Sequence, residues 1–172
     1  MQDLIVSVAD ILGAPGRYRD IAIDADLPDV QNALARLGDE RPVRARLRAE
    51  SVVEGVLVTG RLEAVATAEC ARCLEVTNEP LALEVCELFA TSGTDADAEA
   101  YRLSGTDMDV RPMLVDAVAL ALPLRPLCNP ECRGICSHCG RNLNAGACNC
   151  ATEVPDPRWA PLSALRERLE SG

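Results

Sequence analysis

Eight of the nine cysteines lie in four close pairs, and this pattern restricts the fold more than any other feature of the sequence. In chain order the pairs are Cys70 and Cys73, Cys128 and Cys132, Cys136 and Cys139, and Cys148 and Cys150. A short loop between two cysteines aims both thiolates at one point, and two such loops commonly hold a tetrahedral zinc ion. Four pairs therefore predict two structural zinc ions. A full shell of four thiolates argues against catalysis, because a catalytic zinc normally keeps one position open for water.

The spacing favours one partition of the four pairs and leaves others open. The third pair is followed by Gly140, as in a zinc knuckle, and its nearest partner in sequence is the fourth pair. The first and second pairs would then form the other site. In a competing arrangement the second and third pairs share a metal and the first binds none. A redox role for the first pair is a further alternative, although no thioredoxin-like strand-to-helix pattern surrounds it. Cys86, alone in a predicted strand, is expected to be a buried apolar residue.

The remaining pattern predicts an α+β fold. Residues 43–49 alternate strictly between apolar and arginine side chains, as in a strand with one buried face. Gly55 and Gly60 interrupt the next apolar segment, which predicts bulges or bends in a curved antiparallel β-sheet. Residues 28–37 are expected to form a short helix. Asp109 and Pro112 predict the start of a second helix, apolar on nearly every side and therefore buried. The predicted fold is a curved antiparallel sheet with a buried helix and a C-terminal zinc-binding cysteine module.

Composition divides the chain into two expected domains. Residues 1–127 form the sheet and helix core, interrupted by a mobile acidic loop at about residues 91–109. Residues 128–172 form the cysteine-rich zinc module and end in an amphipathic helix. The apolar stripe of that helix consists of Trp159, Leu162, Leu165 and Leu169.

Charge and composition exclude several functional classes. The formal charge of the chain is -10, and all 17 basic residues are arginine, so a generally basic coat for nucleic acid is excluded. The chain has one histidine, which does not favour an enzyme with a histidine base, so we expect no catalytic residues and no small-molecule substrate. The longest apolar run is too short to cross a membrane. The N-terminal residues lack the pattern of a secretory signal, so a cytoplasmic location is expected.

One segment of this acidic chain carries a local cluster of positive charge. Arg44, Arg46 and Arg48 would lie about 6 to 7 Å apart on one face of a strand, which is close to the phosphate spacing of an extended nucleic-acid strand. These three residues are therefore candidates for contact with RNA or another partner. The alternative is that they form ion pairs across strands, with Glu54, Glu63 or Glu69 as partners.

Several motifs together resemble one known family. They are the segment Cys70-Ala71-Arg72-Cys73-Leu74, the apolar helix that ends at Pro123, the segment Cys132-Arg133-Gly134-Ile135-Cys136 followed by Cys139-Gly140, and the closing Asp156-Pro157-Arg158-Trp159. In this combination they resemble the cysteine-rich Gram-positive members of the YceD family. The resemblance implies a bacterial cytoplasmic factor required for normal accumulation of large-subunit ribosomal RNA, without catalytic activity.

Two hypotheses for function follow. The first is a non-catalytic factor in large ribosomal subunit biogenesis that binds rRNA or a ribosomal protein on a precursor particle. The acidic balance favours a basic ribosomal protein as the direct partner. The second is a zinc- or redox-responsive regulatory protein that acts through a protein partner.

Overall fold

The structure is a computed structural model that describes residues 4–27, 30–38, 42–91 and 100–150, together with residues 158, 162 and 169. The chain divides into two compact units, Met1–Cys132 and Arg133–Gly172. All the strands and the helix named below belong to the first unit. The expected acidic loop falls partly on residues 92–99, and the expected apolar stripe falls partly on Trp159 and Leu165, all of which lie outside the described residues.

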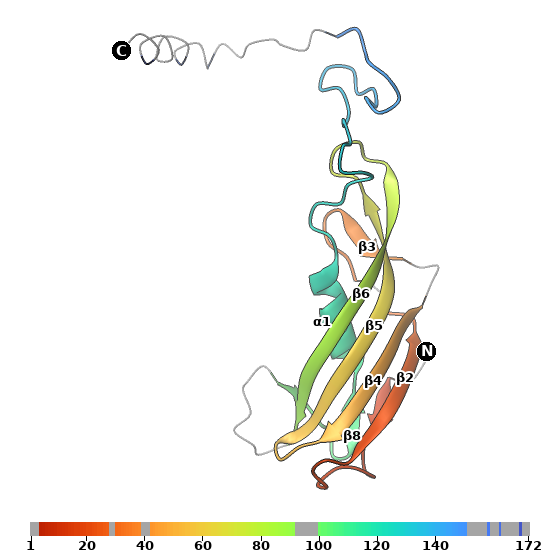
Figure 1. The fold of residues 1–172 in the computed structure, drawn as a ribbon, viewed down its shortest axis with the longest axis vertical. Coiled ribbons are helices and arrows are strands. Elements are labelled where there is room, and N and C mark those ends of the chain that lie inside the picture. The colour runs from red at the N-terminus through yellow and green to blue at the C-terminus, as the bar shows by residue number, and fades with distance from the viewer. Residues whose placement is uncertain are drawn as a thin grey trace. The chain divides into compact units, whose positions relative to one another are not determined.

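The first unit is built on an open, mostly antiparallel sheet (Figure 1). Its strands follow the order β2 (Tyr18–Ala25), β4 (Val43–Ser51), β5 (Gly55–Glu69), β6 (Val76–Ala90) and β7 (Tyr101–Arg102), and β3 (Ala35–Leu37) also pairs with β5. All these pairs are antiparallel except β6 with β7, which is parallel. A separate two-stranded sheet joins β1 (Ile5–Ser7) to β8 (Asp107–Asp109). The α+β prediction is thus confirmed, whereas β8 lies in a segment expected to be loop.

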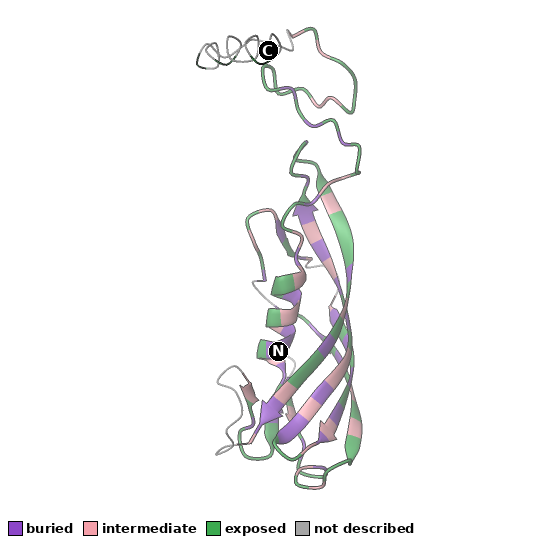
Figure 2. Ribbon diagram, turned by 60° about the vertical axis from the view of Figure 1, so that its left-hand side comes forward, coloured by how far each residue is buried: buried purple, intermediate pink, exposed green. Residues whose placement is uncertain are grey.

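The two faces of the sheet differ because side chains alternate along each strand. In β4, Val43, Ala45, Leu47 and Ala49 are buried, whereas the three arginines between them are exposed. Figure 2 shows the same alternation of buried and exposed residues along the neighbouring strands. The buried side chains, among them Val58, Leu62 and Phe89, form one continuous core with the helix. The opposite face of β2, β4 and β5 is open to solvent, and we call it the outer face.

Helix α1 (Arg111–Ala121) covers the inner face of the sheet. Pro112 lies in its first turn, as predicted. The N-cap is Val110 rather than Asp109 and makes no side-chain capping bond, although the Asp109 carboxylate accepts a hydrogen bond from the Arg111 N–H at 3.0 Å. Met113 and Val118 are buried, but Leu120 is 89% exposed. The expectation of burial on nearly every side is therefore wrong, because only one side of α1 packs on the sheet. No helix among the described residues has the length and apolar character needed to cross a membrane.

The helix predicted over residues 28–37 is wrong. Residues 28 and 29 lie outside the described part of the chain, and the rest forms a turn followed by β3. The side-chain oxygen of Asn32 accepts hydrogen bonds from the N–H groups of Leu34 and Ala35, at 2.9 and 2.8 Å. Such a contact closes a turn in competition with a helix. Pairing of β3 with β5 then satisfies the backbone that follows.

Gly60 of β5 does not form the bulge that was one of the two expectations for it. The register of β5 with β4 and β6 is continuous through Gly60, so the strand has no bulge there. Instead, Gly60 has a φ of 153°, and a Cβ added to it would overlap the carbonyl oxygen of Arg46 on β4. Gly60 therefore allows a close approach of two backbones.

Cys86 is exposed rather than buried, so that expectation is also wrong. It lies on β6 opposite Thr59 of β5, and its side chain belongs to the outer face. A single cysteine in an apolar sequence does not indicate which face of a strand it occupies unless the phase of the alternation is known.

Candidate metal centres and the arginine face

The structure brings the eight paired cysteines together in two tetrads. Within each tetrad the four Sγ atoms lie within 4.8 Å of one another. The first tetrad consists of Cys70, Cys73, Cys128 and Cys132, and the second of Cys136, Cys139, Cys148 and Cys150. The grouping corresponds to the favoured partition of the four pairs and differs from the arrangement in which the first pair stands alone. Each tetrad could hold one metal ion.

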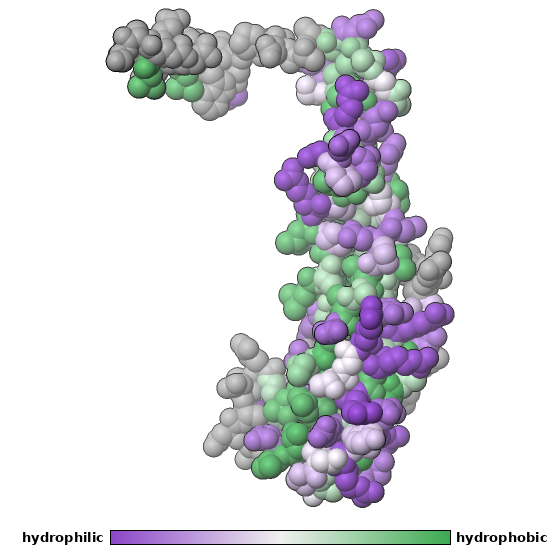
Figure 3. Space-filling view, viewed as in Figure 1, coloured by the Kyte–Doolittle hydropathy of each residue, from purple (hydrophilic) through white to green (hydrophobic). Residues whose placement is uncertain are grey.

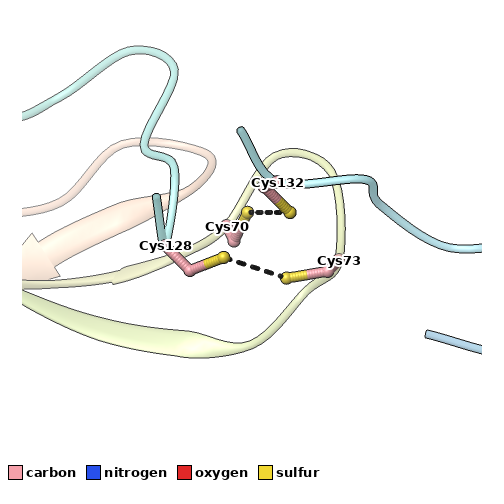
Figure 4. A group of neighbouring side chains, drawn as sticks. All are labelled: Cys70, Cys73, Cys128 and Cys132. Atoms are coloured by element: carbon pink, nitrogen blue, oxygen red, sulfur yellow. Dashed lines mark hydrogen bonds between the residues drawn. The ribbon is translucent and has the colours of Figure 1, made fainter. Parts of the chain in front are cut away.

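The first tetrad connects the tip of the long β5–β6 hairpin to the segment that follows α1. Cys70 directly follows β5, and the Ala71 N–H donates to the carbonyl oxygen of Pro126 at 2.8 Å. The Arg72 guanidinium donates to the carbonyl oxygen of Cys132 at 2.8 Å. These bonds bring two segments about sixty residues apart in sequence to one point. Figure 4 shows their four sulfur atoms directed toward one another.

The distances in the first tetrad suit a tetrahedral metal. The Sγ atoms of Cys70 and Cys132 are 3.8 Å apart, and those of Cys73 and Cys128 are 3.6 Å apart. A zinc ion with Zn–S bonds of about 2.3 Å separates tetrahedral sulfur ligands by roughly 3.8 Å. Cys70 and Cys132 are also buried, at 0% and 3% exposure. A metal held here would be shielded from solvent.

The second tetrad is organised by a knuckle and a small turn-rich loop. The Gly140 N–H donates to the carbonyl oxygen of Cys136 at 2.9 Å, and Gly140 has a φ of 71°, which favours glycine. The His138 N–H donates to the Sγ of Cys136 at 3.4 Å. Across the loop, the Arg133 N–H donates to the side-chain oxygen of Asn144 at 2.8 Å. The His138 N–H thus points at a sulfur that could bind a metal ion, as in knuckle-type sites.

One thiol of each tetrad has a strongly lowered pKa. The backbone N–H of Cys128 lowers the pKa of Cys70 from 9.0 to about 6, against the opposing effect of burial. The backbone N–H groups of Cys139 and His138 lower the pKa of Cys136 to about 6 in the same way. Each tetrad therefore contains one thiol that is deprotonated at neutral pH and can bind an incoming cation.

Another thiol of each tetrad keeps its proton in the absence of a cation. The Glu75 backbone N–H favours the thiolate of Cys73, but burial and the hydrogen bond with Cys70 outweigh it and raise the pKa to about 12. The hydrogen bond with Cys139 and burial raise the pKa of Cys150 to about 12. Several negative sulfurs at such short distances are stable only around a cation, so metal binding would release protons.

Arg44, Arg46 and Arg48, which we call the arginine stripe, lie on the outer face. Asp20 and Asp24 of β2 are ion-pair partners of two of them. The Arg48 guanidinium is 3.0 Å from the carboxylate of Asp20, and that of Arg44 is 3.5 Å from the carboxylate of Asp24. Among the described residues, no ion pair joins the stripe to the three glutamates suggested by the sequence. Arg48 also lies over the ring of Tyr18, 4.1 Å from its centroid.

Arg61 was missed by the sequence reasoning. The register places it on β5, directly opposite Arg46 of the stripe. Both side chains are exposed on the outer face. Only the pairing of two strands reveals this neighbour, because the segment around Arg61 carries no local basic pattern.

Comparison with known proteins identifies relatives of this chain. The family model described as large ribosomal RNA subunit accumulation protein YceD matches residues 58–166. An uncharacterised protein of Mycobacterium tuberculosis is 42% identical over 121 residues, which cover 67% of this chain and 58% of that protein. An uncharacterised protein of Mycobacterium leprae is 33% identical over 158 residues, which cover 84% of this chain and 70% of that protein. The match thus spans less than two thirds of the length of the Mycobacterium tuberculosis relative.

A plant relative has a more informative name. The large ribosomal RNA subunit accumulation protein YCED homolog 1, chloroplastic, of Arabidopsis thaliana is 34% identical over 64 residues, which cover 37% of this chain and 20% of that protein. No solved structure matches the chain. The family match spans more than half of the chain, including all eight paired cysteines, and confirms the resemblance noted in the sequence. The chain belongs to the YceD family of large ribosomal RNA subunit accumulation proteins.

Proposed function

We propose that this protein is a non-catalytic factor in large ribosomal subunit biogenesis, which supports rRNA accumulation by binding rRNA or a ribosomal protein on precursor particles in the bacterial cytoplasm. The family match over residues 58–166 carries this proposal, together with the name of the chloroplast relative. The thiolate-only tetrads agree with it, because such a shell suits a structural metal better than a catalytic one.

The proposal assigns one zinc ion to each tetrad. Zinc prefers tetrahedral shells of cysteine thiolates, and both sets of four sulfurs are close enough to share one ion. In the first unit, zinc would join the β5–β6 hairpin to the chain after α1. In the second unit, it would hold turns whose described residues include few buried side chains. Structural zinc contributes on the order of 10 kcal/mol of folding free energy in small zinc-binding peptides.

Zinc retention should depend on pH in a defined direction. The pKa values of Cys70 and Cys136 are lowered from 9.0 to about 6, so the stability that their thiolates provide is present above the ordinary thiol pKa and is lost as pH falls through about 6. Because protons compete with zinc for all four thiolates of a tetrad, we expect the zinc-loaded protein to keep its metal at pH 7 and to release it as the pH falls further. A chromophoric chelator would record the release. A midpoint above pH 7 would contradict the proposed ligand chemistry.

Sedimentation tests the functional proposal directly. A lysate is separated on sucrose gradients at low and moderate salt, and this protein is followed alongside rRNA. We expect co-migration with large-subunit precursors at low salt, weakened at moderate salt because charged contacts are screened. If the protein stays at the top of the gradient under both conditions, stable binding to the particle is excluded and the proposal fails.

A further inference from the structure

We propose that Arg46 and Arg61 together bind a phosphate of the rRNA backbone on the outer face of the sheet. The inference rests on the proposed function and deepens it, because it names the contact and selects RNA as the direct partner. It begins from a gap in the charge pattern of β2 and β4.

Two of the three stripe arginines have a carboxylate partner within the fold, and the middle one does not. The register places Asp20 opposite Arg48 and Asp24 opposite Arg44. The residue of β2 opposite Arg46 is Ala22, which breaks this alternation of aspartates. Within the described residues, the Arg46 guanidinium has neither an ion-pair nor a hydrogen-bond partner. The stripe therefore presents one free charge rather than three.

The other neighbour of Arg46 adds positive charge. Arg61 lies directly opposite it on β5, and like charges in this position destabilise a sheet. The Arg61 guanidinium is 3.7 Å from the carboxylate of Glu63, and Glu84 of β6 is its next neighbour in register. Exposed ion pairs of this kind contribute little, so a phosphate can replace the Glu63 contact at low cost. A bound anion would relieve the repulsion between the two arginines.

The surface around Arg46 has room for such an anion. One open hollow of about 640 Å³ lies beside Ala22 and Arg46, and its lining also includes Arg48 with its ion-pair partner Asp20. A second, of about 540 Å³, is lined by Arg46 and Arg61 together with Asp24 and Glu63, the ion-pair partners of Arg44 and Arg61. Figure 3 shows hydrophilic side chains gathered over β2 and β4 on this side of the molecule. The small side chain of Ala22 thus exposes Arg46 on both sides, and the carboxylates that line the two hollows are paired with other arginines.

Phosphate suits this pair better than a nucleobase does. Two guanidinium groups can each donate paired hydrogen bonds to phosphate oxygens. Base reading by stacking is not favoured, because the ring of Tyr18 already lies under the Arg48 guanidinium. Contact with the backbone alone carries no sequence information and positions RNA without reading it.

Ala22 offers a test that leaves both arginines in place. In Ala22→Asp, the new carboxylate should pair with Arg46 as Asp20 pairs with Arg48. Ala22→Asn introduces a side chain of nearly the same shape as aspartate but without its charge, and serves as the matched control. Fluorescence anisotropy with labelled oligouridylate should show at least about fivefold weaker binding for Ala22→Asp than for Ala22→Asn, with an unchanged or higher Tm. Equal affinity of the two variants would overturn the inference.

Removing the arginines supplies a second, independent readout. Arg46→Ala/Arg61→Ala should bind oligouridylate about tenfold more weakly, and the slope of log affinity against log salt should decrease by roughly 1 to 2. Arg17→Ala removes an exposed charge that lies outside both hollows, and should stay within about twofold of the unmodified protein. An unchanged salt slope in the double variant contradicts phosphate contact at this pair.

The same proteins separate this inference from the proposed function. If the unmodified protein binds polyglutamate as tightly as oligouridylate, the partner is an acidic protein and the RNA assignment fails. If it co-sediments with precursor particles and the double variant does so equally well, the phosphate contact fails while the functional proposal stands. If it binds oligouridylate through the pair but never co-sediments, the phosphate contact stands and the function must be revised.

Discussion

Replacing Cys70 and Cys73 by serine should remove one of two zinc equivalents and lower the Tm of the sheet unit by more than about 10 °C. The physical reason is the position of the tetrad, whose ligands come from the hairpin tip and from the segment after α1. Without the metal, these segments are joined by a few hydrogen bonds, such as the one from the Ala71 N–H to Pro126, and by the packing of Leu127 against the buried cysteines. Metal analysis and thermal unfolding, followed by circular dichroism, measure both effects.

The second tetrad provides the matched control. Cys136→Ser/Cys139→Ser should also lose one zinc equivalent, but the Tm of the sheet should not change, because these ligands belong to the unit Arg133–Gly172. Limited proteolysis should then cut after Cys132 and leave the first unit intact. If either double variant loses both zinc ions, or if the two shift the Tm of the sheet equally, the assignment of two independent sites is wrong.

Gly60→Ala should destabilise the sheet by at least about 3 kcal/mol. The added Cβ would overlap the carbonyl oxygen of Arg46 and lie 2.8 Å from the Cα of Leu47. Both contacts are to backbone, so no flexible side chain can move aside. The φ of 153° adds strain of its own. Urea unfolding followed by circular dichroism would give the difference in free energy.

Gly13→Ala measures the strain of a positive φ without any overlap of the added Cβ. Gly13 also has a positive φ, 76°, but an added Cβ would have no neighbour within 4 Å. It should therefore cost only the backbone strain, about 1 kcal/mol. If Gly60→Ala is no more harmful than Gly13→Ala, then β4 and β5 are not held together as closely as the structure places them.

Local periodicity made several elements predictable. The alternation in residues 43–49 predicted β4 and its exposed arginines, and Pro112 with Asp109 predicted the start of α1. The pairing of cysteines at short spacing predicted two groups of four. For β4 and α1 the deciding interactions lie within a few residues along the chain, so the sequence carries the signal directly.

Contacts between residues far apart in sequence decided the features that the local pattern predicted wrongly. Residues 30–37 form a turn and a strand because Asn32 closes the turn and β5 supplies a partner for β3. Leu120 and Cys86 are exposed because each element packs on one side only. A local apolar pattern does not reveal where the neighbouring layer ends.

The arginine stripe shows most clearly how local sequence and long-range pairing differ in what they predict. The alternation in residues 43–49 was enough to predict that Arg46 lies on the exposed side of a strand between two other arginines. The pairing of strands, which no local pattern shows, placed Ala22 on one side of it and Arg61 on the other. The register between strands decides which charges are neutralised, and that register is set by packing of the buried face across the whole sheet.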